Sequence, residues 1–314
     1  MTLRFYIGIF TFCLSFFSML LNILIFIPVF RLAFVSKKSS VYIIALFNII
    51  TDMLQLFVTC FYFSASIIAD RYMFSGERLG ALSVFFGWIF IEAWFMESLV
   101  QIVMSVNRFA VITMKKNNFF TYKNTLLIFA FLILITSISS CCIQYFFPCC
   151  QVIADYATLS YMFVEIEGQV SYSNLLVLFY DVICLIIPTI CYILVFRTIR
   201  NSNKNAPANV QRSRSNQDIK YLIQFVFISL FYLLTWMTFF ILPLLAPNGP
   251  AEWYSIVPIF VTFNCSSNAI IFLTVNREVQ KALGIPWLKI KIKGLSSSVS
   301  STIQVMPRIP TNSN

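Results

Sequence analysis

The chain has 314 residues, of which 59% are hydrophobic and 11% are charged, and its formal net charge is +10. Soluble domains carry about 25% charged residues, so this composition excludes a soluble globular protein and indicates an integral membrane protein. The chain contains no His, which excludes His-based zinc sites and His general bases.

Seven apolar segments follow one another along the chain, and each exceeds the roughly 20 helical residues that span a bilayer. In chain order they cover residues 5–30, 41–69, 79–113, 124–147, 173–196, 220–245 and 254–275. Membrane β-strands are only about 10 residues long and alternate in polarity, so runs of this length predict helices. The expected fold is an all-α bundle of seven transmembrane helices.

The basic residues indicate how this bundle is oriented, because Lys and Arg concentrate in cytoplasmic loops. With the amino terminus outside and the carboxyl terminus in the cytoplasm, 19 of the 22 basic residues lie on the cytoplasmic side, and only Arg4, Arg71 and Arg78 do not. The positive charge therefore reflects membrane topology and contact with the anionic inner leaflet. It does not indicate nucleic-acid binding.

Three polar stretches are expected on the cytoplasmic side. Residues 198–219 predict a mobile loop. Residues 276–293 predict a basic amphipathic segment that lies on membrane lipid. Residues 294–314 predict a disordered Ser-rich tail.

Enzyme and transporter motifs are absent or weak. No GxSxG, P-loop or dinucleotide fingerprint occurs. Asp181 lacks the second, facing carboxylate that an intramembrane aspartyl protease shares a proton with. No repeat relates the two halves of the chain, as many transporters show. We therefore expect a protein that is not an enzyme and that holds no metal.

Polar residues inside the apolar segments are functional candidates, because each costs free energy in the bilayer. They are Asn22, Asp52, Glu92, Glu97, Arg108, Asp181, Asn264 and Asn268.

These positions resemble those of the rhodopsin-like G-protein-coupled receptors over roughly residues 10–285. Asn22 and Asp52 match the polar residues of the first and second helices in that family. Arg108 matches the Arg of the Asp-Arg-Tyr motif. Pro188 matches the fifth-helix Pro, and 268-NAIIF-272 matches the Asn-Pro-x-x-Tyr motif.

More narrowly, four short stretches are similar to nematode serpentine chemoreceptors of an srx- or srv-like class. They are 107-NRF-109, 123-KNT-125, 147-FPCC-150 and 276-NRE-278.

The chain departs from the larger family at several motifs. Asn107 replaces the acidic neighbour of the Arg, and Phe109 and Phe272 replace Tyr residues. No Cys lies between Asp70 and Trp88, so the family's usual bridge from the third helix to the second outer loop cannot form. Cys149 and Cys150 lie on the oxidising side, where a disulfide is expected with a partner that the sequence does not identify.

The resemblance implies a cytoplasmic switch at Asn107, Arg108 and Phe109, with Asn268 and Phe272 on the last helix. The alternative for Arg108 is a side chain that only anchors its charge at the headgroups. We hypothesise that Asp218 holds Arg108 in the resting state, and the alternative for Asp218 is a solvated loop charge.

The resemblance also brings Glu97 close to Asp52, in a group with Asn22 and Asn264. Two close carboxylates cannot both ionise cheaply, so we expect them to share a proton or bind Na⁺. The alternative is that each hydrogen-bonds separately to a helix backbone.

Asp181 lies about 10 Å outward of Pro188 along the helix, at a depth where the family binds small ligands. We expect Phe90, Trp94, Trp236 and Phe240 to line the same site, although helical aromatics also serve as packing residues. The acids of the second outer loop, including Asp155, are expected to make the entrance negative. Glu92 is expected to form an interhelical contact or to reach the membrane surface.

The sequence therefore predicts a chemosensory receptor that binds a small chemical in the bundle and activates a heterotrimeric G protein. It is expected in the plasma membrane of sensory neurons, and the resemblance implies arrestin binding at the Ser-rich tail. Two alternatives stay open: a seven-helix ligand-gated channel or transporter, and a family member that does not signal.

Overall fold

The structure is a computed structural model of the chain. It describes residues 2–74, 76–116, 119–204, 227, 229–246 and 249–284. The predictions for Asp218, for residues 220–226 and 228 of the sixth segment, for residues 285–293 and for the tail 294–314 fall outside these ranges.

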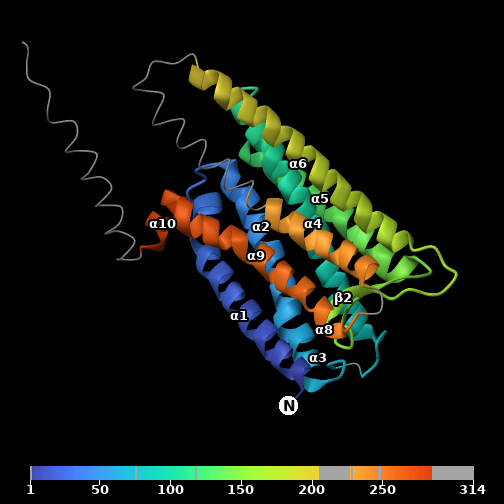
Figure 1. Ribbon diagram of the computed structural model, residues 1–314. Coiled ribbons are helices and arrows are strands. Elements are labelled where there is room, and N and C mark those ends of the chain that lie inside the picture. Colours follow the sequence, from blue (N-terminus) through green and yellow to red (C-terminus); the bar gives the residue numbers. More distant parts are fainter. Residues whose placement is uncertain are drawn as a thin grey trace, which may run out of the picture.

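The described chain is an elongated bundle of helices, with the amino terminus at one end and α10 at the other (Figure 1). The helices are α1 (Leu3–Phe30), α2 (Ser40–Phe57), α3 (Ser64–Ala69), α4 (Ala81–Ile112), α5 (Tyr122–Cys141), α6 (Tyr172–Lys204), α8 (Ala251–Tyr254), α9 (Ile256–Val275) and α10 (Arg277–Leu283). A further helix, Ser229–Leu245, precedes α8. Three π-helical turns extend α1 (Arg31–Val35), join α2 to α3 (Val58–Phe63) and extend α5 (Cys142–Phe146).

Six helices in the described ranges are long and apolar enough to cross a membrane. Their outer faces carry large exposed apolar side chains such as Leu127, Phe131 and Phe179. Water disfavours such a surface, whereas the hydrocarbon of a bilayer accepts it. The predicted helical membrane protein is therefore confirmed.

Helix ends follow local signals in the sequence. The side chains of Ser39 and Thr121 accept hydrogen bonds from the first turns of α2 and α5, as N-cap residues do. The Asn276 side chain accepts from two backbone amides of α10. At the other end of α10, Gly284 has a φ of 67°, which suits a glycine after a helix.

Two expectations need correction. Residues 152–163 form an antiparallel hairpin of β1 (Val152–Asp155) and β2 (Ser160–Phe163), with Val152 opposite Phe163 and Asp155 opposite Ser160. The protein is thus mostly helical rather than all-α. The predicted loop 198–219 also begins too early, because α6 continues as a helix to Lys204. Helix propagation adds one hydrogen bond per residue and does not stop where the apolar run stops.

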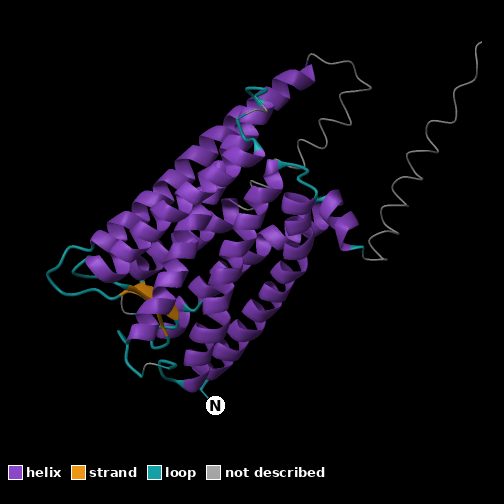
Figure 2. Cartoon of the chain, turned by 180° about the vertical axis from the view of Figure 1, so that it is seen from behind, coloured by secondary structure: helices purple, strands orange, loops and turns teal. Residues whose placement is uncertain are grey.

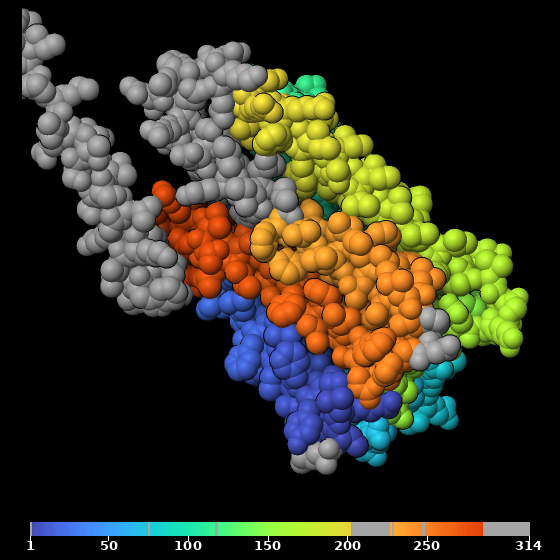
Figure 3. All heavy atoms as spheres, viewed as in Figure 1, coloured from blue at the N-terminus to red at the C-terminus, as the bar shows by residue number. Residues whose placement is uncertain are grey.

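The hairpin covers one end of the bundle, which we call the hairpin end (Figure 2). We call the opposite end, next to the helix Arg277–Leu283, the α10 end. The central helix is α4, which packs against α2, α5, α6 and β1. The helix Ser229–Leu245 lies beside α9, and its atoms are the lighter orange ones in Figure 3, whereas those of α9 are deeper orange.

Candidate functional site

Two small cavities lie inside the bundle, and Asp181 lines both. The hairpin cavity has a volume of about 30 Å³ and lies beneath β1 and β2. The α6 cavity has a volume of about 40 Å³ and lies between α6 and the helix Ser229–Leu245. A single water needs about 10–15 Å³, so each cavity has room for a few small atoms.

The side chains around the hairpin cavity are mainly aromatic and aliphatic. Three come from the hairpin itself, and the others come from α4, α6, α9 and the helix Ser229–Leu245. The lining is Phe90, Ile91, Trp94, Val152, Tyr161, Phe163, Val177, Asp181, Thr235, Phe239, Val257 and Val261.

The Asp181 carboxylate joins three helices through hydrogen bonds. Its Oδ1 atom accepts from Trp94 Nε1 of α4 at 3.0 Å and from the Tyr232 hydroxyl at 2.6 Å. The Tyr232 hydroxyl also lies 2.5 Å from Ser98 Oγ of α4. Asp181 is 2% exposed, and its Oδ2 atom accepts no hydrogen bond from the described residues. A buried carboxyl group on α6 is thus hydrogen-bonded to α4 and to the helix Ser229–Leu245.

The structure brings together most of the predicted ligand residues. Phe90, Trp94 and Asp181 line the hairpin cavity, and Trp236 lines the α6 cavity. Phe240 lines neither cavity and packs against Trp236, with ring centroids 5.7 Å apart. It therefore contacts one of the other candidates without lining a cavity itself.

Sequence reasoning missed Tyr232 and the three hairpin residues of the lining. Tyr232 lies one helical turn before Trp236, so the spacing of four was a usable signal. The hairpin residues had no such signal, because they lie in a stretch that reads as a loop.

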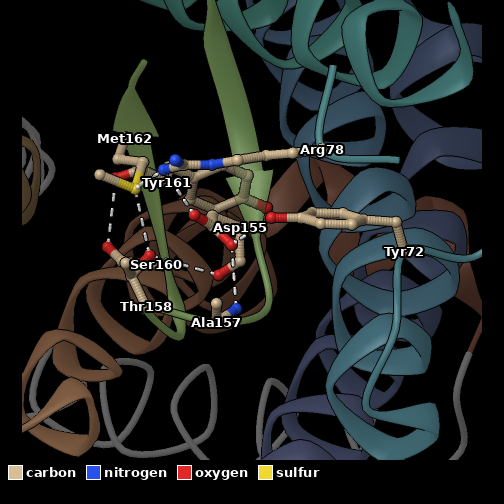
Figure 4. Close-up of polar contacts among 8 residues, drawn as sticks. All are labelled: Tyr72, Arg78, Asp155, Ala157, Thr158, Ser160, Tyr161 and Met162. Carbon is tan, nitrogen blue, oxygen red and sulfur yellow. Dashed lines mark hydrogen bonds and ion pairs between the residues drawn. The ribbon is translucent and has the colours of Figure 1, made fainter. Parts of the chain in front are cut away.

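An ion pair and a hydrogen bond attach the hairpin to the loop before α4 (Figure 4). Asp155 accepts from Arg78 at 2.9 Å and from the Tyr72 hydroxyl at 2.7 Å. We call these three residues the hairpin clamp. Burial of the Tyr72 hydroxyl, and then its hydrogen bond to the Asp155 carboxylate, raise the pKa of Tyr72. Because Asp155 is buried and paired, it does not contribute to a negative entrance, contrary to expectation.

Two further contacts seat the hairpin on the bundle. The Gln144 side chain donates to the Val152 carbonyl at 2.8 Å and accepts from the Val152 amide at 3.1 Å. Gly87 of α4 lies so near that an added Cβ would be 2.0 Å from the Val152 carbonyl oxygen. Cys149 and Cys150, just before β1, form a disulfide with each other. The Gln144 hydrogen bonds and the close approach at Gly87 position the hairpin on the bundle. The disulfide that usually links this loop to the third helix in the larger family is missing.

A second polar group lies toward the α10 end, around Asp52 and Glu97. Asp52 accepts from the Asn48 and Asn268 side chains, each at 3.0 Å. Glu97 accepts from Gln55 at 2.7 Å and from Asn264 at 2.6 Å. The two carboxylates are fully buried and close enough to interact electrostatically. The donors to both carboxylates are side-chain amides rather than helix backbones.

Oxygen acceptors outnumber donors in this second group. Among the described residues, six buried oxygens here lack a hydrogen-bond donor; they are Asn22 Oδ1, Asn48 Oδ1, Asp52 Oδ1, Gln55 Oε1, Asn264 Oδ1 and Asn268 Oδ1. The Asn22 amide donates to the Cys265 carbonyl at 3.1 Å, so α1 joins the group as well. A proton or a cation with oxygen ligands would satisfy such an excess. In the described ranges no three His, Cys, Asp or Glu residues form a metal cluster.

Glu92 is an interhelical contact, which was one of its two expected roles. Its carboxylate accepts from three hydroxyls of α5, on Thr136 at 2.8 Å, Ser137 at 3.2 Å and Ser140 at 2.7 Å. It lines neither cavity.

The predicted switch residues lie near the α10 end. Asn107 is buried in α4, whereas Arg108 and Phe109 are partly exposed one turn before the helix ends. Arg108 lies within electrostatic reach of Tyr192 on α6. Asn268 donates to Asp52, and Phe272 is buried in the apolar core with residues of α1 and α2. Of the two switch candidates on α9, Asn268 thus connects to the second polar group.

Glu278 of α10 bonds to two residues around the start of α2. Lys38 Nζ lies 2.5 Å from its Oε1 atom, and the Tyr42 hydroxyl donates to its Oε2 atom at 2.5 Å. Partial burial works to raise the pKa of Glu278, but the hydrogen bonds from Lys38 and Tyr42 and the charge of Lys38 outweigh it, so the pKa lies below its ordinary value. This contact fastens α10 to the start of α2.

Comparison with known proteins places this arrangement among receptors. The family described as "Serpentine type 7TM GPCR chemoreceptor Srx" matches residues 12–276, which favours the srx-like over the srv-like class. Squid rhodopsin is similar in structure, with a TM-score of 0.69 and 15% identity, over 91% of this chain and 86% of the rhodopsin chain. At that identity the likeness shows a common seven-helix fold alone. No curated protein matches the chain.

Proposed function

Because the chain belongs to the Srx family of serpentine seven-transmembrane G-protein-coupled chemoreceptors, we propose that it binds a small chemical inside the bundle and activates a heterotrimeric G protein. The family is a class of receptors and not of enzymes. The observation that carries the proposal is Asp181, a buried carboxylate that lines both cavities and bonds to two neighbouring helices.

The proposed orientation puts the hairpin end outside the cell and the α10 end in the cytoplasm. The support is the charge distribution, since the basic loops at the α10 end would face the anionic leaflet. The chemical would then enter beside the hairpin. We place the receptor in the plasma membrane of sensory neurons, with arrestin as a further partner at the Ser-rich tail.

The contacts of Asp181 suggest how binding is transmitted. A ligand that bonds to Asp181 competes with Trp94 and Tyr232 for the same carboxylate. Weakening the Tyr232 contact loosens the helix Ser229–Leu245 from α4, which favours a state with an opened cytoplasmic face. Arg108 lies on that face in the proposed orientation and contacts the G protein there.

Along α4, Glu97 of the second polar group lies between Trp94, which bonds to Asp181, and Arg108. We propose that Asp52 and Glu97 share a proton or hold Na⁺ in the resting state. The excess of acceptor oxygens around them supports this assignment. A change in the group would alter the contact between Asn268 of α9 and Asp52 of α2.

Measurement of nucleotide exchange on Gα subunits tests the proposed receptor function. Wild-type receptor in membranes is combined with a panel of Gα subunits and screened with small chemicals, beside Arg108→Ala. We expect the wild type to accelerate nucleotide exchange on a Gα subunit and Arg108→Ala not to accelerate it. Arg197→Ala is the matched control, because this exposed Arg lies near the same end on α6, and its exchange rate should stay at the wild-type level.

The same vesicles serve to measure ion and solute flux. Ligand-dependent flux without exchange on any Gα subunit would replace the receptor assignment by a channel or transporter. Ligand binding without exchange or flux would identify a family member that does not signal.

A further inference from the structure

The chemistry around Asp181 defines what a ligand must supply. Within the described residues, its Oδ2 atom accepts no hydrogen bond, although a carboxylate has about four acceptor sites. No Lys or Arg of the described chain forms an ion pair with it. A buried charge is costly unless it is paired. Asp181 therefore has an open acceptor atom and no cationic partner among the described residues.

The other polar groups of the hairpin cavity are already satisfied. The Thr235 hydroxyl donates to the Phe231 carbonyl at 2.9 Å, and the Tyr161 hydroxyl bonds to Thr59 at 2.7 Å. The rest of the lining is apolar, with the rings of Phe90 and Tyr161 stacked at 3.7 Å between centroids. A molecule in this cavity thus meets hydrocarbon, and it reaches the covered Oδ2 atom of Asp181, a lining residue, only when the side chains around that atom shift.

We propose that the ligand is a small organic ammonium ion. Its N–H groups donate to Asp181 Oδ2 and its charge pairs with the carboxylate, while its short hydrocarbon body fills the hairpin cavity. Aromatic faces such as that of Trp94 attract the same cation. The small cavity volume restricts the body to a few carbon atoms. This inference rests on the proposed function, because it takes the cavities beside Asp181 as the ligand site.

Thermal unfolding of the purified full-length receptor tests the ligand class without any signalling readout. The compounds share one carbon skeleton and differ in the polar group: n-butylamine, 1-butanol and 2-butanone. The amine should raise Tm at concentrations about 10–100-fold lower than the alcohol, because a charge-assisted hydrogen bond adds about 1.5–3 kcal/mol. The ketone, which cannot donate a hydrogen bond, should have the weakest effect. Stabilisation by the ketone or the alcohol that equals or exceeds that by the amine would overturn the inference, as would no stabilisation by the amine.

Asp181→Asn removes the charge and keeps the size of the side chain. It should abolish the preference for the amine over the alcohol. Glu92→Gln is the matched control, since it neutralises another carboxylate of the bundle that lines neither cavity, and it should leave the preference unchanged. If Asp181→Asn does not fold, Val257→Leu narrows the hairpin cavity and should weaken the amine effect. Persistence of the full effect in Val257→Leu would contradict the assigned cavity.

The two proposals fail separately. Amine binding without G-protein activation would refute the coupling and leave the ammonium site intact. G-protein activation by neutral compounds alone would support the receptor and refute the ammonium ligand.

Discussion

At the scale of single residues, the buried carboxylates of this receptor differ in what satisfies them. Amides surround Asp52 and Glu97, serine and threonine hydroxyls surround Glu92, and Asp181 has an indole and a phenol. Each environment predicts a different response to mutation. The hydrogen bonds of Asp181 connect three helices, so substitutions of its partners should affect both stability and the balance between signalling states.

Tyr232→Phe removes one of the two donors to Asp181 and the contact with Ser98. Leaving a buried carboxylate with one donor costs about 1–3 kcal/mol, so Tm should fall. Basal nucleotide exchange should rise, because the helix Ser229–Leu245 is released from α4. Tyr180→Phe is the control: its hydroxyl bonds Ser139 of α5 at 2.8 Å, so it should lower Tm without raising basal exchange. Equal basal exchange in both variants would refute a switching role for Tyr232.

Glu97→Gln tests the proposed cation or proton at the second polar group. The wild type has two buried carboxylates that can bind Na⁺, so replacing choline by Na⁺ at constant ionic strength should stabilise it. A binding free energy of about 1 kcal/mol shifts Tm by about 2–4 °C. The variant has one carboxylate fewer and should lose this shift, whereas Glu92→Gln should keep it. An unchanged Na⁺ and pH dependence in Glu97→Gln would show that the two carboxylates act independently.

At the scale of elements, the helices could be predicted and the hairpin could not. Apolar runs of more than 20 residues have no alternative in a bilayer. The strands have only four residues each, and nearly all of their side chains are buried, so the alternation that reveals a half-exposed strand is absent.

Part of the candidate site could be predicted from the free-energy cost of burying Asp181 and Glu97, but Tyr232 resembled an ordinary packing residue in the sequence. Phe240 does not line the hairpin cavity, because one step along a helix turns a side chain by about 100° and Phe239 occupies the position that faces it.

Asp155→Asn weakens the hairpin clamp. The charge-assisted bonds to Arg78 and Tyr72 contribute about 1.5–3 kcal/mol each at a buried acceptor, although the half-exposed Arg78 reduces its share. Amide hydrogen exchange in β1 and β2 should accelerate by about tenfold, the equivalent of 1.4 kcal/mol. Glu165→Gln changes an exposed acid of the same loop and should leave exchange as it is. Unaltered protection in Asp155→Asn would mean that other contacts hold the hairpin.

Gly87→Ala tests the seat of the hairpin on α4. The new methyl group would collide with the Val152 carbonyl and with the Gln144 amide, at 2.0 Å and 2.6 Å. Overpacking of this kind destabilises by about 1–3 kcal/mol, and the hairpin must shift to relieve it. We expect a lower Tm together with weaker ligand binding. Wild-type ligand affinity in this variant would show that the position of the hairpin does not shape the cavity.

At the scale of the whole molecule, our central proposal is that the two ends of the bundle have different functions. In this proposal the hairpin end receives the chemical, and the α10 end binds the G protein. Both statements depend on the orientation, because an inverted bundle would present the cavities to the cytoplasm and Arg108 to the outside. Squid rhodopsin shares the fold, and the basic residues of this chain supply the argument for its direction.

Side-specific cysteine labelling measures this orientation most directly. In a Cys13→Ser background, which removes the exposed native thiol, single cysteines are introduced by Glu165→Cys at the hairpin end and Lys116→Cys at the α10 end. Both positions are exposed. A membrane-impermeant maleimide should label Glu165→Cys in intact cells and Lys116→Cys only after permeabilisation. The reverse pattern would contradict the receptor account and would favour a channel with its amino terminus inside.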